Sequence, residues 1–443
     1  MFRNFLLEKC ILPLGDRFSG SGFMNELQYW RSEVGKLDPA GLKHLQKERL
    51  SRLLKHAVTQ IPYYRNLSIS LTNDPYADIR QFPVMHKNLM KQHIDELYVG
   101  DRSKMIVEKS SGSSGIQGEV YMTLDENRRY QAVQTFLWEW SGYRMGMPMM
   151  QTGMTLKRGL IKGAKDFLFQ THYVNAFELE YGKMVAELQM AHRKGCSYFG
   201  GYASSLNVYA EAAKKAGIDL HFKGVIAWGD KLFDHYKKNI AGAFGNPIIT
   251  ELYGTTEGFV ISGTCEGSNH HQLSPQTFIE LLDKDGNEVQ PGERGFVVAT
   301  RLDAFSFPLI RFYTGDIAVK EDAAVQCSCG RAFPLLRKII GRDTDIIHTP
   351  SGKALIVHFF TGILEHFEEI KQFKVIQRVK EEIEIEYIPA TNCNEEVLQM
   401  VQSVIYEKAN EVFPIRFKQV QNIAVTASGK PQIIQNLVAE KLV

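Results

Sequence analysis

The chain of 443 residues contains a Ser/Gly segment, Ser110-Ser-Gly-Ser-Ser-Gly115, whose residue types suit a bound anion. Glycines let backbone N–H groups converge on phosphate oxygens, and the serine hydroxyls add further donors. Strand-forming residues flank it, Val107-Glu-Lys109 before and Val120-Tyr-Met122 after. This strand–loop–strand context differs from a Walker-type loop, which opens a helix. The alternative is a flexible surface linker, which Gly/Ser runs often form.

A second polar segment, Tyr253-Gly-Thr-Thr-Glu257, follows the β-branched run Pro247-Ile-Ile-Thr250. We expect a strand that runs into a tight polar turn. An aromatic face suits a nucleotide base, a hydroxyl suits a phosphate, and a hard carboxylate suits Mg²⁺. Taken singly, Tyr253 could be a half-buried tyrosine at a strand end and Glu257 a solvated loop acid.

Three further segments follow in the chain: Tyr313-Thr-Gly-Asp316, Gly341-Arg342 and, near the C-terminus, Ser428-Gly-Lys430. A carboxylate such as that of Asp316 can accept hydrogen bonds from two vicinal hydroxyls of a ribose. Its alternative is an aspartate that closes a turn. Lys430 could equally be a surface lysine in a Ser-Gly turn.

Cysteine and histidine cluster in two places. Cys265 is followed by His270 and His271, and some sixty residues later comes the pair Cys327 and Cys329. Three thiolates and one imidazole form a tetrahedral set that suits structural Zn²⁺, with either histidine as the fourth ligand. The alternative is a group of reduced thiols in a turn. The other three cysteines are isolated and predicted to be packing residues.

Composition sets the broad class. Hydrophobic residues make up 44% of the chain and charged residues 23%, as in ordinary globular proteins. A net charge of +2 without a basic block gives no electrostatic case for nucleic acid. No apolar run reaches the roughly 20 residues that span a bilayer. The N-terminus lacks the pattern of a signal peptide. With few cysteines, we expect a cytoplasmic protein.

The elements that would position these residues alternate in type. Apolar spacing predicts a helix over residues 40–60 and a second after Pro83. Asp125 is a predicted N-cap for a helix that continues to Trp140. Strands and helices then alternate to residue 241, which favours parallel α/β layers. Ligands in such sheets lie where strands end, so Gly229, Asp230 and the loop after Leu252 occupy site-like positions.

From Phe278 the pattern changes to strands with turn signals, which predicts a barrel-like antiparallel β subdomain at about 262–335. After Gly341 we expect a helix near 359–367, strands over 373–378 and 382–387, a helix over 394–410 and a last strand near 417–420. The fold class is therefore α/β, with a large N-terminal domain over 1–340 and a small α+β domain over 341–443.

The ordered set of motifs resembles that of the adenylate-forming (acyl-CoA synthetase) superfamily, and most of all phenylacetate-CoA ligases and their capsule-biosynthesis relatives. The resemblance extends from about residue 60 to the end. It implies that ATP and Mg²⁺ activate a carboxylic acid to acyl-AMP and that CoA accepts the acyl group. It also implies structural Zn²⁺, since several phenylacetate-ligase relatives have a Cys…His pair and a Cys-x-Cys-Gly-Arg segment at these places; the family pattern favours His271 over His270.

The resemblance also implies roles for single residues. Tyr253 would stack on adenine, Thr256 would contact the α-phosphate, Glu257 would bind Mg²⁺ and Asp316 would bind the ribose. Lys430 would be carried into the site by the small domain, so the catalytic residues would be Thr256, Glu257 and Lys430. The remaining predicted cofactor-binding residues are Ser110, Ser111, Gly112, Ser113, Ser114, Gly115, Gly229, Asp230, Gly254, Thr255 and Arg342.

Two departures from the family pattern concern charge. After the second glycine of the Ser/Gly loop the family usually has Lys-Pro, but this chain has Ile116-Gln117. Pyrophosphate therefore lacks one cation, for which Lys109 or Arg128 are the candidate substitutes. In the hinge motif, Thr344 takes the position of the usual aspartate.

Three functions remain open from the sequence. The first is an acid–thiol ligase that uses CoA. The second keeps the adenylation but passes the acyl group to an amine, a hydroxyl or a carrier protein, and the capsule-biosynthesis likeness favours it. The third is a degenerate nucleotide-binding module. The expected partners are a carboxylic acid, ATP and CoA, without nucleic acid or a membrane span; whether the chain forms a homodimer, and which acid it uses, stay open.

Overall fold

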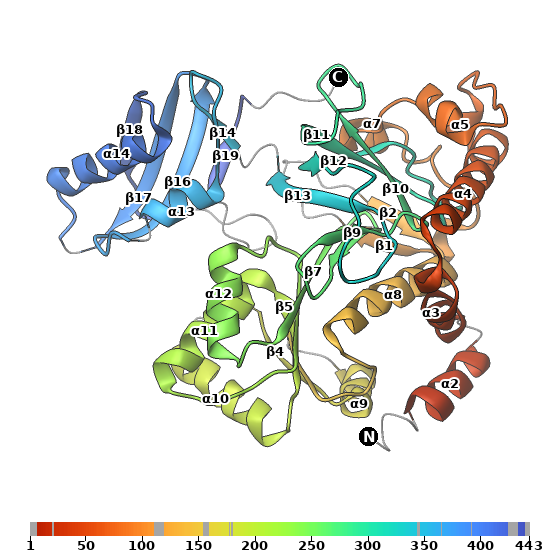
Figure 1. Ribbon diagram of the computed structural model, residues 1–443, viewed down its shortest axis with the longest axis horizontal. Coiled ribbons are helices and arrows are strands. Elements are labelled where there is room, and N and C mark those ends of the chain that lie inside the picture. Colours follow the sequence, from red (N-terminus) through yellow and green to blue (C-terminus); the bar gives the residue numbers. More distant parts are fainter. Residues whose placement is uncertain are drawn as a thin grey trace.

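The computed structural model describes residues 7–19, 22–109, 119–153, 159–176, 178, 180–342, 346–364, 366–390, 392–423 and 433–438 (Figure 1). Its N-terminal part is helical. After a π-helical turn at Leu7–Ile11 come α2 (Leu12–Ser19), α3 (Phe23–Ser32), α4 (Pro39–Gln60), α5 (Pro62–Arg65), α6 (Pro75–Asp78) and α7 (Lys87–Gln92).

Helix α4 confirms the helix predicted over 40–60. Asp38 caps it by accepting from the N–H of Gly41 at 2.7 Å, and Pro39 occupies the first turn. Its buried residues recur at helical spacing and join a core shared with the antiparallel strands; they include Leu50, Leu53, Leu54 and Ala57.

Strands β1 (Ile106–Lys109) and β2 (Glu119–Met122) pair antiparallel, which confirms the strands expected on both sides of the Ser/Gly segment. Helix α8 (Leu124–Trp138) follows. Asp125 was predicted as its N-cap, but the cap is Thr123. The Thr123 hydroxyl accepts from the N–H of Glu126 at 3.2 Å, and the Glu126 carboxylate accepts from the N–H of Thr123 at 2.8 Å. With this reciprocal capping box the helix starts at Leu124, two residues earlier than an N-cap at Asp125 would place it.

Alternating strands and helices form the parallel half of an 11-stranded sheet, as predicted. Figure 1 shows α10, α11 and α12 together on one side of these strands, where they bury an apolar cluster against the sheet. In chain order the elements are β3 (Met149–Gly153), α9 (Gly159–Phe169), β4 (Thr171–Asn175), α10 (Tyr181–Arg193), β5 (Tyr198–Tyr202), α11 (Ala203–Ala216), β6 (Gly224–Trp228), α12 (Asp234–Ala243) and β7 (Ile248–Thr255).

The predicted antiparallel strands are present and pair with one another beyond β7. They continue the same sheet, whose order is β10-β11-β12-β13-β9-β8-β7-β6-β5-β3-β4. The sheet curls, since the Thr277 hydroxyl of β10 donates to the Val260 carbonyl of β8 at 2.8 Å. This half comprises β8 (Phe259–Thr264), β9 (His270–Gln272), β10 (Thr277–Leu282), β11 (Arg294–Arg301), β12 (Phe312–Lys320) and β13 (Leu335–Arg342).

Residues from 346 onward have their own apolar core, in which Val375, Ile385 and Val401 are fully buried. A four-stranded sheet of order β18-β17-β16-β19 carries this core, with α13 and α14 beside it (Figure 1). The elements are β14 (Ile346–His348), β15 (Ala354–Ile356), α13 (Val357–Leu364), β16 (Ile370–Val379), β17 (Glu382–Pro389), α14 (Glu395–Ala409), β18 (Ile415–Gln419) and β19 (Ile434–Asn436). Among the described helices, none has the length and apolar character needed to cross a membrane.

Candidate active site and metal centre

Strand β7 changes partners in its middle. Its residues Ile248–Glu251 pair in parallel with β6, and Leu252–Thr255 pair antiparallel with β8. We call this change of pairing the switch point of the sheet; it lies at the carboxyl end of the parallel pairing, the side at which open α/β sheets bind ligands. Tyr253, Gly254 and Thr255 lie on the strand beyond the switch, and Glu257 lies in the turn that follows. The expected polar turn therefore begins later, at Thr256.

Three of the predicted residues meet beside this strand. The Tyr253 hydroxyl donates to Oδ2 of Asp316 at 2.8 Å, and Nε of Arg342 lies 3.7 Å from Oδ1 of the same carboxylate. Burial raises the pKa of Tyr253 well above its ordinary value, and the Asp316 charge acts in the same direction, so the tyrosine stays protonated as a donor. The structure thus brings an aromatic ring, a carboxylate and a guanidinium together from β7, β12 and β13.

Glu257 is 5% exposed and needs a cationic partner, since a buried charge without one is costly. Nζ of Lys87 lies 2.9 Å from its Oε1. Burial acts to raise the pKa of Glu257, but the Lys87 ammonium and local hydrogen bonds together lower the pKa below its ordinary value. Glu257 is therefore ionised at neutral pH. Sequence reasoning missed Lys87, because a lysine in the first turn of a short helix carries no local signal.

Backbone pairing places Lys87 at this site. The N–H of Met85 donates to the Arg311 carbonyl at 2.8 Å, and the N–H of Tyr313 donates to the Met85 carbonyl at 3.0 Å. These bonds fix the chain before α7 against the start of β12. Arg311 itself is buried and ion-paired to Glu280, with Nε 3.0 Å from Oε2.

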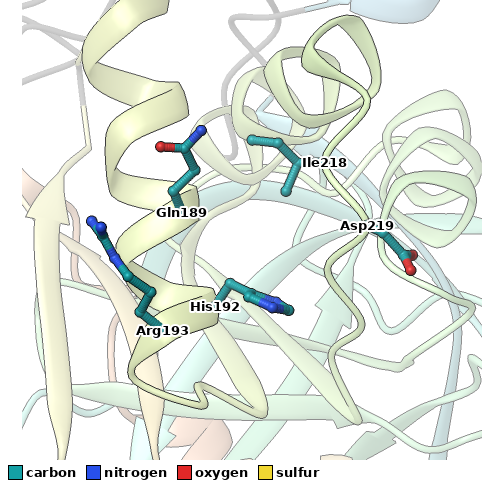
Figure 2. Close-up of a pocket in the computed structure, with 5 residues that line it drawn as sticks. All are labelled: Gln189, His192, Arg193, Ile218 and Asp219. Carbon is teal, nitrogen blue, oxygen red and sulfur yellow. The ribbon is translucent and has the colours of Figure 1, made fainter.

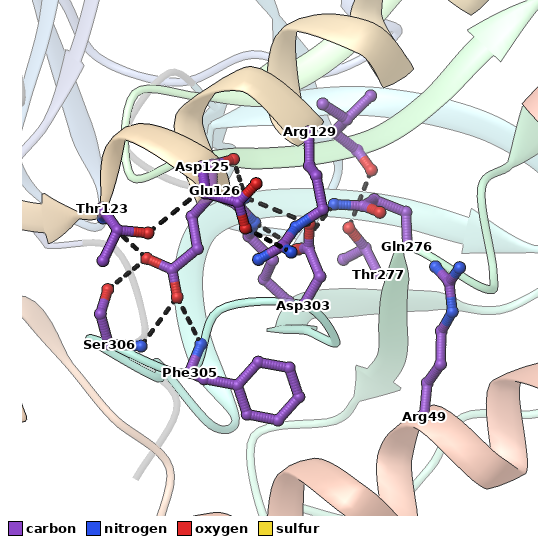
Figure 3. A network of polar contacts seen from close by, with 12 residues as sticks. Arg49, Thr123, Asp125, Glu126, Arg129, Gln276, Thr277, Asp303, Phe305 and Ser306 are labelled. Carbon is purple, nitrogen blue, oxygen red and sulfur yellow. Dashed lines mark hydrogen bonds and ion pairs between the residues drawn. The ribbon is translucent and has the colours of Figure 1, made fainter. Parts of the chain in front are cut away.

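A polar network joins α8 to the segment after β11 (Figure 3). Glu126, on α8, accepts from the N–H groups of Phe305 and Ser306 at 2.7 and 2.8 Å. Arg301 donates from Nε to Oδ1 of Asp303 at 2.6 Å and from Nη2 to the Glu126 carbonyl at 2.8 Å. Arg301 and Glu257 line one small cavity with residues of β2. The network thus links α8 to the end of β11 and borders the cavity that Glu257 also lines.

Asp230 occupies the loop after β6, as predicted, but its oxygens are engaged locally. Oδ1 accepts from the N–H of Ala203 at 2.5 Å, and Oδ2 accepts from the N–H of Ser204 at 3.2 Å. Both N–H groups belong to the first turn of α11, where a carboxylate is favourable. Gly229 precedes it with φ of 82°, a conformation that favours glycine. The observed role of Asp230 is to join the β6–α12 loop to α11.

Several predicted residues fall outside the described residues: Ser110, Ser111, Gly112, Ser113, Ser114, Gly115, Ile116, Gln117, Thr344 and Lys430. Of the two candidate substitutes for the missing loop cation, Lys109 ends β1 and Arg128 lies on α8. Thr256 is exposed in the turn before Glu257.

The cysteine and histidine cluster assembles as predicted, with His271 as its histidine. One ligand atom each from Cys265, His271, Cys327 and Cys329 lies within 4.8 Å of the others. Sγ of Cys265 is 3.7 Å from Sγ of Cys327, and Sγ of Cys329 is 3.3 Å from Nε2 of His271. Tetrahedral Zn²⁺ separates such ligand atoms by roughly 3.5–3.8 Å, so the four atoms fit this ion.

Neighbouring contacts prepare His271 as a ligand. Its Nδ1 lies 3.1 Å from the Phe333 carbonyl oxygen, which can only accept, so Nδ1 carries the proton and Nε2 is free to coordinate. Burial lowers the pKa of His271, which favours the neutral form that binds metal. His270 points elsewhere, because side chains alternate along β9; its Nε2 lies 3.6 Å from Oε2 of Glu251.

A groove of about 370 Å³ lies on the outer helical layer (Figure 2). Figure 2 shows its side chains coming from α10 and from the segment after α11: Gln189, His192, Arg193, Ile218 and Asp219. None of the residues predicted for nucleotide, acid or metal lines this groove, so the candidate site is at the switch point.

No protein-family model matches the chain, but individual proteins are similar to it. A phenylacetate-coenzyme A ligase of Thermus thermophilus is 26% identical over 337 residues, which cover 72% of this chain and 74% of that protein. Protein CapK of Staphylococcus aureus is 20% identical and covers 94% and 95%. Indoleacetate–lysine synthetase of Pseudomonas savastanoi is 24% identical and covers 52% and 58%.

Solved structures share the fold. A 2-hydroxyisobutyryl-CoA ligase in the postadenylation state, in complex with an acyl-AMP, matches with a TM-score of 0.67 at 16% identity and covers 89% of each chain. The match therefore extends over most of the chain.

Proposed function

Because the chain is a member of the adenylate-forming acyl-CoA synthetase superfamily, we propose that it activates a carboxylic acid with ATP and transfers the acyl group to CoA. One observation carries this proposal. Tyr253, Asp316 and Arg342 meet at the switch point of the sheet, and the ionised Glu257 lies in the next turn. The Tyr253 ring suits the base, the Asp316 carboxylate suits the ribose, and the Glu257 carboxylate suits Mg²⁺.

In the first step, an oxygen of the substrate carboxylate attacks the α-phosphorus of ATP, and pyrophosphate leaves. Two anions must approach, so catalysis consists of positioning and charge neutralisation. Tyr253 would stack on adenine and Asp316 would bind the ribose hydroxyls. Glu257 is the carboxylate that would hold Mg²⁺, whose charge would neutralise phosphate oxygens. Lys87 now pairs with Glu257 and would be free to face phosphate once Mg²⁺ takes that carboxylate.

The proposal includes two domains, residues 1–340 and 341–443. The separate core of residues from 346 onward supports this division. Lys430, in the C-terminal domain, would reach the site only for adenylation. Zn²⁺ on Cys265, His271, Cys327 and Cys329 would join the ends of the antiparallel strands and take no part in catalysis.

The acceptor has two candidates. The phenylacetate-coenzyme A ligase likeness supports CoA. The indoleacetate–lysine synthetase and CapK likenesses support an amine or another nucleophile. Screening a panel of carboxylic acids for pyrophosphate release identifies the acid. AMP release that depends on CoA then supports the thiol ligase, whereas AMP release that depends on lysine or another amine, without CoA, supports the alternative. No pyrophosphate release with any acid would contradict both.

Asp316→Ala is expected to weaken ATP binding by removing charge-assisted hydrogen bonds, each worth roughly 1.5–3 kcal/mol or about 10- to 100-fold in Kd. Calorimetric titration with ATP measures this loss. Asp285→Ala, in an exposed turn, is the matched control. Unchanged ATP affinity in a folded Asp316→Ala protein would show that the ribose assignment is wrong.

Lys87→Met is expected to lower acid-dependent pyrophosphate release by about 10- to 100-fold, as for other residues that support a metal ligand. The change also removes the charge that lowers the pKa of Glu257. Because Glu257 acts as a carboxylate, the acidic limb of the pH–rate profile should move to higher pH. Lys91→Met, exposed on the same helix, is the control. An unchanged rate and pH profile would remove Lys87 from the site.

A further inference from the structure

Lys231 is a half-buried lysine for which the proposed mechanism has no role. It immediately follows Gly229 and Asp230 in the connection between β6 and α12. Its Nζ donates a hydrogen bond to the backbone carbonyl oxygen of Ile340 at 2.5 Å. Ile340 lies near the end of β13, which is the last strand of the 11-stranded sheet in chain order. The bond therefore joins the β6–α12 loop, beside the switch point, to β13.

The bonded carbonyl belongs to an irregular position of β13. Ala318 of β12 is opposite Ile339, and Ile317 is opposite Gly341, so Ile340 has no partner in the β12–β13 register. Gly341 has φ of 120°, which favours glycine. A bulge of this kind bends the strand and interrupts its pairing. A side chain that holds the carbonyl at this point therefore fixes the direction of the strand end.

The surroundings leave the Lys231 amine protonated at neutral pH. Burial lowers the pKa of Lys231 to about 8, while Glu251 of β7 and Asp234 of α12 oppose this shift; Lys338 of β13 and Lys237 of α12 reinforce it. At pH 7 the group is still an ammonium. A charged donor makes a stronger hydrogen bond to a carbonyl than a neutral one does.

The bulge lies near the end of β13, which is the last strand in the chain before the C-terminal part. One residue after Gly341 comes Arg342, whose Nε is 3.7 Å from Asp316. The next described strand, β14, begins at Ile346 and contacts the C-terminal sheet, since Nδ2 of Asn436 donates to the Ile346 carbonyl at 2.6 Å. Figure 1 shows β13 directed toward this part of the molecule.

We propose that Lys231 is a positioning residue that ties the β6–α12 loop to the bulge in β13 and thereby sets the orientation of the C-terminal part for adenylation. The consequence for catalysis rests on the proposed function, whereas the contact itself does not. Lys231 would touch neither the acid nor ATP. It would act through the Ile340 carbonyl, and its loss would affect the step that needs the C-terminal part in place.

The test compares three variants of the full-length protein. Lys231→Met keeps the length of the side chain and removes the donor, Lys231→Arg keeps a charged donor, and Lys238→Met changes an exposed lysine of α12 as the control. The first measurement is hydrogen–deuterium exchange of peptides within residues 336–342. We expect exchange about 10- to 100-fold faster in Lys231→Met, as for loss of one charge-assisted bond, and wild-type exchange in the other two.

The second measurement separates the half-reactions by single-turnover kinetics. Lys231→Met should slow acyl-AMP formation about 10- to 100-fold, with transfer from supplied acyl-AMP unchanged, and Lys231→Arg should restore the first step. Unchanged exchange in Lys231→Met would overturn the contact, and equal losses in both steps would overturn the positioning role. If the wild-type protein forms no acyl-AMP, the proposed function is wrong, and the hydrogen–deuterium exchange measurement alone tests the Lys231 contact. Faster exchange in Lys231→Met would then support the contact, and unchanged exchange would overturn it.

Discussion

Lys430→Ala is expected to damage the two half-reactions unequally. Acyl-AMP formation should slow by roughly two to three orders of magnitude, because the variant lacks a cation aimed at charge that develops in the transition state. Transfer from supplied acyl-AMP should change little, since the acceptor attacks a carbonyl and AMP departs without that cation. Single-turnover kinetics of each half-reaction measures the difference.

Lys371→Ala is the control for this experiment, because Lys371 is an exposed lysine of the same C-terminal part, on β16. It should leave both steps at the wild-type rate. If Lys430→Ala slows both steps equally, then either Lys430 has a structural role or the C-terminal domain does not move between the two half-reactions. No loss in either step would make it a surface lysine.

The second large effect concerns the metal. The purified protein is expected to contain about one Zn²⁺ per chain. Cys329→Ser should lower the metal content and lower the melting temperature by on the order of 10 °C, because a structural site contributes its binding free energy to folding. Elemental analysis and calorimetry measure the two quantities. Removing Zn²⁺ with a chelator should have the same effect on the wild-type protein.

Cys10→Ser is the matched control, since Cys10 is a half-buried free cysteine outside the cluster. Its metal content should equal that of the wild type. The metal site would be contradicted if protein purified without chelators contained no zinc. It would also be contradicted if the Cys329→Ser variant were as stable as the Cys10→Ser variant.

The regular parts of the fold were predictable because local periodicity encodes them. The apolar spacing of α4 and the alternation of strands and helices over β3–β7 appear directly in the sequence. The continuity of the sheet was not predictable. It depends on β7, which pairs with β6 through Glu251 and with β8 from Leu252 onward, and no residue type marks that change.

Residues of the candidate site were predictable only where a sequence motif indicates their chemical role. Residue types predicted three cysteines and one histidine as candidate zinc ligands, and the structure places His271 rather than His270 in the cluster because strand alternation points the two rings to opposite faces. Lys87 was missed because it meets Glu257 through the pairing of Met85 with β12, a contact between distant segments. Asp230 was predicted beside the nucleotide, and the structure adds its bonds to α11.

The transfer of an oxygen atom tests the central claim, carboxylate activation as acyl-AMP, most directly. A carboxylic acid labelled with ¹⁸O in its carboxylate is incubated with ATP, Mg²⁺, an acceptor and the purified protein, and the nucleotide product is analysed by mass spectrometry. If the carboxylate attacks the α-phosphorus, one labelled oxygen remains on the phosphate when AMP leaves. The account predicts AMP that carries one ¹⁸O, formed together with pyrophosphate. Unlabelled AMP, or ADP and phosphate in its place, would contradict it.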